Sequence, residues 1–218
     1  MKTYKLSPHA LNLYQECRRC FWEGQNGLKR PSGPFPSLPS GMDKIIKQRF
    51  DTHRKKNELP EELSGLEDVA LYTGQELKEW QNQRKGLQWT SEQGNILAGA
   101  LDDVLQTAFG ELIVLDYKTR GFPLKELPTY YTLQLECYTL LLQKKGFKTR
   151  ENAYLLFYWP EKFSESGEVN FTHKLLEVAV NSEHAENAFT GAVSLLQGEK
   201  PDANKDCSFC SYRDGKKA

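Results

Sequence analysis

The spacing of apolar and polar residues in the first quarter of the chain predicts two helices joined by a loop. Ser7 followed by Pro8 predicts the N-cap and first residue of a helix. Residues 30–41 hold four prolines and two glycines, which predicts an extended loop. Apolar residues at helical spacing then predict a second helix over about residues 42–56, while the acidic stretch that follows, to about residue 85, gives no clear pattern.

From residue 86 the pattern changes to the alternation that is typical of strands. Strands are expected near 86–91, 95–106 and 111–119, and Phe109-Gly110 is expected to turn the last hairpin. An apolar helix is expected over 129–145.

The remaining elements alternate between strand and helix. A strand is expected over 152–160 and is predicted to stop at Pro160, a second strand over 168–180, and a last helix over about 182–196. This order predicts an α/β fold with a central mixed sheet flanked by helices.

Composition narrows the class of protein. The chain has 218 residues, of which 39% are hydrophobic and 27% charged, and its formal net charge is zero. These values suit a single domain, and any nucleic-acid surface must come from segregated charge. The sequence shows no leader peptide or membrane span, so we expect a cytoplasmic protein, whose five cysteines serve metal or redox chemistry rather than disulfides.

The segment LIVLDYKT places two charged residues within an apolar strand. Asp116 and Lys118 are two positions apart, so their side chains share one face of the strand, while Tyr117 points away. Burying two charges is costly unless they pair or bind a ligand. An internal salt bridge near the strand end is the simplest interpretation, and a catalytic pair is the alternative.

Asp102 and Asp103 interrupt the preceding predicted strand. If that strand pairs with 111–119, one of these acids lies beside Asp116, and the two carboxylates would repel unless a divalent cation lies between them. Mg²⁺ or Mn²⁺ suits oxygen ligands and leaves room for a phosphate oxygen. The carbonyl of Tyr117 could be a further ligand, and Lys118 could direct the hydrolytic water.

Gln134 and Tyr138 lie one turn apart on the apolar helix that follows. A glutamine among leucines suggests a polar partner, which the charged end of the sheet would provide. The alternative is an exposed Gln134 and a half-buried Tyr138.

Together these motifs resemble the RecB-like branch of the PD-(D/E)XK nuclease superfamily. The three motifs are G-x-x-D at Gly99 to Asp102, D-Y-K at Asp116 to Lys118, and Q-x-x-x-Y at Gln134 to Tyr138. The resemblance implies a restriction-endonuclease-like core in which Asp102 and Asp116 bind Mg²⁺ or Mn²⁺. It also implies that Lys118 is catalytic and that Gln134 and Tyr138 assist at the site or contact DNA, while Asp103 faces the other way.

One expected ligand of this family is missing. Many RecB-like nucleases carry a histidine in a G-x-x-x-H pattern, but here Gly41 is followed four residues later by Ile45. His53, on the same predicted helix, or an acid such as Glu92 could substitute for it.

Two C-x-x-C pairs lie near opposite ends of the chain: Cys17 with Cys20, and Cys207 with Cys210. Two such turns can complete a tetrahedral set of thiolates for Zn²⁺ or for an iron–sulfur cluster, although two unconnected turns without metal are the alternative. CRISPR-associated and AddB-type nucleases resemble this arrangement, which implies a [4Fe-4S] cluster. Such relatives often have one cysteine ligand before the core and three after it, whereas this chain has two at each end, so zinc stays as the alternative. Cys137 is expected to be a core residue.

The expected organisation is a single nuclease domain over 1–218, with residues 1–40 and 198–218 forming a cysteine-clasped subregion. Basic residues concentrate in the N-terminal half, with Phe21 and Trp22 among them, which favours single-stranded DNA. They are Arg18, Arg19, Lys29, Arg30, Lys44, Lys47, Arg49, Arg54, Lys55 and Lys56, with Arg84, Lys85 and Arg120 as an extension.

The function predicted from these residues is a metal-dependent DNase, an exonuclease acting on single strands or DNA ends, and the resemblance implies DNA-repair or CRISPR-adaptation proteins as partners. A catalytically silent nucleic-acid-binding module is the first alternative. The second is an unrelated α/β protein with a structural zinc clasp, which predicts that the acids and Lys118 lie apart.

Overall fold

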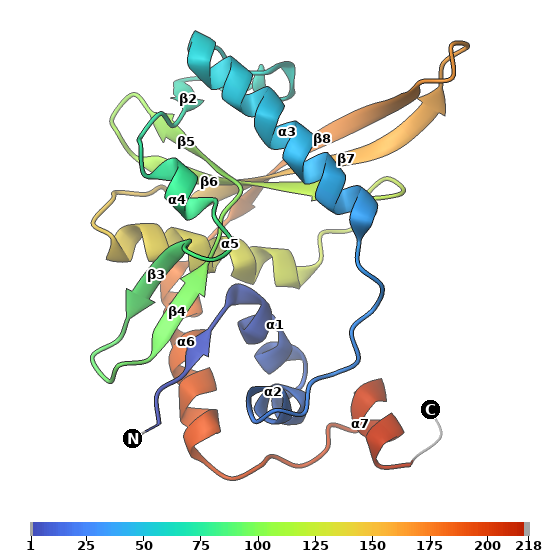
Figure 1. Cartoon of the computed structure of the whole chain (residues 1–218). Coiled ribbons are helices and arrows are strands. Elements are labelled where there is room, and N and C mark those ends of the chain that lie inside the picture. Colours follow the sequence, from blue (N-terminus) through green and yellow to red (C-terminus); the bar gives the residue numbers. More distant parts are fainter. Residues whose placement is uncertain (1, 216–218) are drawn as a thin grey trace.

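A five-stranded mixed sheet forms the centre of the computed structural model, which describes residues 2–215 (Figure 1). The strand order is β2-β5-β6-β7-β8; β6 and β7 are parallel, and the other neighbours are antiparallel. The strands are β2 (Val69–Leu71), β5 (Asp103–Thr107), β6 (Leu112–Thr119), β7 (Asn152–Phe163) and β8 (Val169–Ala179). The predicted mixed sheet and the hairpin that joins β5 to β6 are confirmed.

A smaller sheet of β1 (Lys5–Leu6), β4 (Ile96–Gly99) and β3 (Leu87–Thr90) lies below it, in the order β1-β4-β3. The single strand predicted over 95–106 is wrong, because the chain leaves β4 at Gly99, bends at Asp102 and enters the larger sheet as β5. The break is visible only in the pairing of the strands, because β4 pairs with β1 and β3 whereas β5 pairs with β2 and β6. Asp102 therefore lies where the two sheets meet.

Helices cover both faces of the larger sheet. The long α3 crosses one face diagonally, and α5 packs on the other face, with α6 behind it (Figure 1). The helices are α1 (Pro8–Glu16), α2 (Arg18–Gln25), α3 (Ser37–Lys56), the 3-10 turn η1 (Glu61–Leu63), α4 (Leu77–Trp80), α5 (Thr129–Lys144), α6 (Ser182–Gln197) and α7 (Ser208–Arg213).

The apolar run of β6 reflects burial on both faces. Val114 packs in the core with α5 and α6, while Leu115 packs in the core with α3, and successive strand residues alternate in this way. By this alternation Asp116 faces the α5 side and Tyr117 faces the α3 side.

Two predicted boundaries were wrong because of prolines. The helix expected from residue 42 begins at Ser37, since Pro39 lies in its first turn, where a backbone NH has no helical partner to lose. The strand predicted to stop at Pro160 continues to Phe163, because the β7–β8 register shifts between Pro160 and Lys162 and accommodates the proline at this irregularity.

The first helix begins as predicted, with the Ser7 side chain accepting a hydrogen bond from the NH of Ala10. The polar C-terminal segment returns to the N-terminal helices, so that α7 packs beside α2 (Figure 1). No helix within residues 2–215 has the length and apolar character needed to cross a membrane.

Candidate active site and cysteine cluster

Asp102, at the bend just before β5, lies beside Asp116 of the neighbouring strand β6. The β5–β6 register pairs Asp103 with Leu115, so extending it by one residue brings Asp102 opposite Asp116. Oδ2 of Asp102 accepts a hydrogen bond of 3.0 Å from the backbone NH of Tyr117, which fixes the carboxylate beside β6. The two acids therefore meet without help from a distant loop.

Asp116 is almost fully buried, with 1% of its surface exposed. Burial, opposed by the Lys118 ammonium and reinforced by the Asp102 carboxylate, raises the pKa of Asp116 to about 7. Oδ2 of Asp116 has no hydrogen-bond partner among the described residues, although Lys118 lies beside it as an ion pair. The acid is therefore held in a buried position by the Lys118 ammonium and lies beside a second carboxylate.

A polar chain extends from Lys118 to α5. The Lys118 ammonium donates to Oε1 of Gln134 at 3.1 Å, and Nε2 of Gln134 donates to the hydroxyl oxygen of Tyr138, also at 3.1 Å. Tyr138 is buried, and Gln134 is partly buried. The exposed-glutamine interpretation is therefore wrong, and the amide fixes the position of the lysine.

Gly99 makes room for this chain. A Cβ at Gly99 would lie 2.8 Å from Cε1 of Tyr138 and 3.2 Å from Cδ of Pro8. The first residue of the G-x-x-D motif is thus needed for packing, because no larger residue fits between β4, α5 and the start of α1.

Asp103 points to the opposite face of the sheet, as expected. Its carboxylate accepts hydrogen bonds from Nη2 of Arg54 at 2.6 Å and from the Tyr117 hydroxyl at 2.7 Å. Burial raises the pKa of Asp103, while the charge of Arg54 opposes the shift. Asp103 is therefore a buried ion-pair partner of α3.

A lysine, rather than the histidine typical of the family, reaches Asp102 from α3. Ile45 is 60% exposed, and Lys47, two residues later on α3, donates to Oδ1 of Asp102 at 2.7 Å and also pairs with Asp43. Sequence analysis missed this role of Lys47, because only the packing angle of α3 shows which helical residue reaches the acid. His53 and Glu92, the substitutes suggested by the sequence, are not among the residues that line the cavity at the acids.

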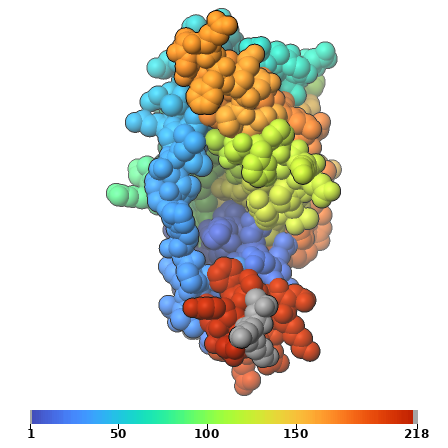
Figure 2. All heavy atoms as spheres, turned by 90° about the vertical axis from the view of Figure 1, so that its right-hand side faces the viewer, coloured from blue at the N-terminus to red at the C-terminus, as the bar shows by residue number. Residues whose placement is uncertain are grey.

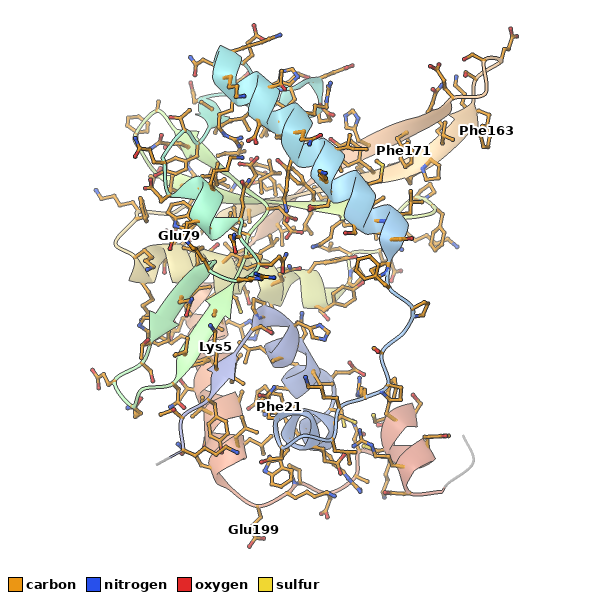
Figure 3. All side chains as sticks on the ribbon, in the orientation of Figure 1. Lys5, Phe21, Glu79, Phe163, Phe171 and Glu199 are labelled. Atoms are coloured by element: carbon orange, nitrogen blue, oxygen red, sulfur yellow. The ribbon has the colours of Figure 1, made fainter. Side chains whose placement is uncertain are left out.

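The site opens into a cavity of about 640 Å³. Asp102, Asp116, Lys118, Gln134 and Tyr138 all line it, so the structure brings together every side chain that the three motifs single out. The rest of its lining includes exposed basic residues: Lys5 (labelled on β1 in Figure 3), His9, Arg84 and Lys85. Cationic walls around two acids suit a polyanion that approaches a metal centre.

The acids fit a hard divalent cation. The buried carboxylate of Asp116, which faces the Lys118 ammonium, and the Asp102 carboxylate beside it offer the oxygen ligands that Mg²⁺ and Mn²⁺ prefer. Such an ion polarises a phosphoryl group and lowers the pKa of a bound water. Lys118, which Gln134 holds at the cavity wall, adds a cation beside the two acids.

The four cysteines from the two ends of the chain form one buried cluster. Their sulfur atoms all lie within 4.8 Å of one another. The separation is 3.5 Å between Cys17 and Cys210, and 3.7 Å from Cys20 to each of Cys207 and Cys210. A tetrahedral ion with metal–sulfur bonds near 2.3 Å requires sulfur separations of about 3.8 Å. The interpretation as unconnected turns is therefore wrong.

Positive charge compensates this cluster. Nη2 of Arg30 donates to Sγ of Cys207 at 3.3 Å, while its guanidinium lies over the ring of Phe209. Burial raises the pKa of Cys207, but hydrogen bonds from backbone NH groups, with those of the neighbouring thiols, lower it to about 7. Cys137 is separate: it is fully buried in the core between the sheet and the helices, as predicted.

The predicted basic surface needs correction. Phe21 is fully buried and cannot stack on a base, and Arg54 serves Asp103 rather than a ligand. Other members form ion pairs with acids of the protein itself, among them Arg19 with Glu23 and Asp214, and the exposed Arg49 with Glu62. Charge runs in a sequence do not show which cations already have partners. Arg84 and Lys85, which were expected as an extension of the surface, do line the cavity.

A mixed sheet with two acids at adjacent strands, below a cationic cavity, places the chain among α/β proteins of nuclease type. The family model of the PD-(D/E)XK nuclease superfamily matches residues 29–214, and the chain belongs to this superfamily. The crystal structure of SSO0001 is similar to the chain at a TM-score of 0.42 and 13% identity, covering 98% of this chain and 86% of that one. No curated protein matches the chain.

Proposed function

We propose that this protein is a metal-dependent deoxyribonuclease of RecB-like type that hydrolyses phosphodiester bonds in single-stranded DNA or at DNA ends, as an exonuclease. The observation that carries the proposal is the convergence of Asp102, Asp116 and Lys118 on one cationic cavity. The membership of the chain in a nuclease superfamily supports the same class of substrate.

Each residue of the site has a distinct role in this proposal. Asp102 and Asp116 hold Mg²⁺ or Mn²⁺, with the carbonyl of Tyr117 as a further ligand. Lys118 positions the attacking water and offsets negative charge on the phosphate. Gln134 orients Lys118 through the 3.1 Å hydrogen bond, and Tyr138 in turn orients Gln134.

The four cysteines hold a metal centre that clasps residues 1–40 to residues 198–218 within a single nuclease domain. Four clustered thiolates can hold the [4Fe-4S] cluster that the RecB-like assignment suggests, with one tetrahedral zinc ion as the alternative. Because cysteines that hold a metal rather than form disulfides suit a reducing compartment, we also propose a cytoplasmic location. Proteins of DNA repair or CRISPR adaptation are the partners that the RecB-like assignment suggests.

The deciding experiment is cleavage of end-labelled single-stranded DNA with Mg²⁺ or Mn²⁺, comparing the wild type with Asp116→Ala. We expect metal-dependent cleavage that the substitution abolishes. A duplex with blunt ends and a closed circular single strand distinguish end-dependent from internal cleavage. Equal cleavage by both proteins would place the activity outside this site.

A catalytically silent DNA-binding module is the second candidate, and one observation favours it. Lys47 pairs with Asp102 and Lys118 pairs with Asp116, so both acids are neutralised without a metal ion. In this case neither protein cleaves DNA with either metal, and binding is retained and weakens with increasing salt.

A further inference from the structure

A second cavity, of about 980 Å³, adjoins the first. The two cavities share four lining residues: Ser7, His9, Asn12 and Tyr130. Figure 2 shows the hollow between the segment that connects α2 to α3 and the yellow-green segment before α5, with the dark-blue N-terminal helix at its base. The site therefore continues as a track along α1 toward the cysteine cluster.

The walls of the second cavity combine cationic and aromatic groups. Lys29 is exposed, and Arg30 lies beside it. Glu16 also lines the cavity and pairs with Nη1 of Arg30 at 2.7 Å, so the charges of these two side chains offset each other and the exposed Lys29 is the cation that faces a ligand. Tyr130 and Phe209 supply ring surfaces. Cations for phosphates and rings for bases are the elements of a single-strand binding groove.

Tyr130 is held at the junction of the two cavities. Its ring is 4.3 Å from the ring of Tyr131, its carbonyl oxygen accepts a hydrogen bond of 3.0 Å from Asn12, and the residue is still 47% exposed. An exposed ring can stack only on a base face that no neighbouring base covers, and single strands offer such faces along their whole length. The position thus suits a single strand.

We propose that the second cavity binds the single strand beyond the scissile phosphate, with a base stacked on Tyr130 and the following phosphate held by Lys29. This inference rests on the proposed function and adds the path of the substrate. It places the strand between α1 and residues 29–32, next to the cysteine cluster.

The test is binding of 5′-labelled oligothymidines of increasing length, measured by fluorescence anisotropy without divalent metal. Wild-type affinity should rise with length until both cavities are filled. Tyr130→Ala should weaken binding of the long strands about tenfold or more, while Tyr130→Phe retains it. Lys29→Ala should lower the affinity only for strands long enough to reach the second cavity. It should also reduce the dependence of affinity on salt by about one released ion.

Phe163→Ala is the matched control, because Phe163 is an exposed aromatic residue near the tip of the projecting β7–β8 hairpin, far from both cavities (Figure 3). It should bind and cleave like the wild type. If the wild type binds and cleaves DNA but neither Tyr130→Ala nor Lys29→Ala changes the length dependence, the track is wrong and the proposed function stands. If the wild type neither binds nor cleaves single strands, the proposed function itself fails.

Discussion

Asp102 and Asp103 are adjacent acids with opposite tasks, because the strand turns their side chains to different faces. Asp102 faces the cavity and is 18% exposed, whereas Asp103 is buried against Arg54 and the hydroxyl of Tyr117. The first is available to a ligand, and the second is committed to the packing of α3 on the sheet.

This difference predicts a large loss of stability for Arg54→Met. Removing the guanidinium leaves the buried Asp103 carboxylate without its cation, which typically costs about 3–5 kcal/mol. Urea denaturation followed by circular dichroism measures the free energy of unfolding. Lys55→Met, an exposed change on the same helix, should alter it by less than about 0.5 kcal/mol. Similar values for both variants would mean that the Asp103–Arg54 pair is not what stabilises this interface.

Replacing Lys47 should increase the affinity of the site for a divalent metal ion. Its ammonium lies 2.7 Å from the Asp102 carboxylate and competes with a cation for the same oxygen. Lys47→Met should therefore tighten Mn²⁺ binding about tenfold, or about 1.4 kcal/mol, in isothermal titration calorimetry. Lys44→Met, an exposed change on α3, should leave the affinity unchanged. Unchanged or weaker binding in Lys47→Met would show that the lysine assists the ion.

At the scale of elements, the site depends on how closely β4 approaches α5. Gly99 of β4 lies against the ring of Tyr138, and that ring holds the Gln134 amide which in turn holds Lys118. The smallest residue of one sheet thus determines the position of a side chain on the other. Packing between elements, rather than the motif alone, orients the lysine.

Gly99→Ala should destabilise the protein by about 1–3 kcal/mol and reduce DNA cleavage, because the added methyl group would overlap the Tyr138 ring. Gly41→Ala is the opposite case: its Cβ would meet nothing within 4 Å on helix α3, so stability should hold or rise by up to about 1 kcal/mol. Urea denaturation of both variants tests the pair. A Tyr138→Leu change added to Gly99→Ala should recover part of the lost stability if the ring is the cause.

For the molecule as a whole, the cysteine cluster joins two segments that are far apart in the chain. Cys20 and Cys207 are 187 residues apart, yet their sulfur atoms lie at 3.7 Å. A link over a loop of this length restricts the unfolded chain by about 5 kcal/mol in the loop-entropy treatment of a crosslink. The clasp also anchors α7, which contributes Phe209 to the second cavity.

Metal removal, or Cys20→Ser, should accordingly lower the melting temperature by about 10–20 °C. Differential scanning calorimetry measures the shift, and assays of iron, sulfide and zinc identify the centre. Cys137→Ala should leave the metal content unchanged, since Cys137 lies in the core away from the cluster. Equal melting temperatures with and without metal would contradict a structural clasp.

Much of the fold was predictable because it follows from local patterns. Ser7 caps α1 as predicted, and the apolar run identified β6 and the hairpin that leads into it. The predictions failed where local signals conflict with long-range pairing. Pro39 and Pro160 looked like boundaries but lie in a first helical turn and at a strand irregularity, where a missing NH costs little.

The sequence by itself determined which residues can do chemistry: the order and spacing of Asp102, Asp116 and Lys118, and the two C-x-x-C pairs, follow directly from it. Tertiary structure alone decided how these groups are used. It showed that Lys47 reaches Asp102, that Phe21 is buried, and that Tyr130 connects two cavities. The physical reason is that spacing along a strand fixes the face of a side chain, whereas its partners depend on the angles at which distant elements pack.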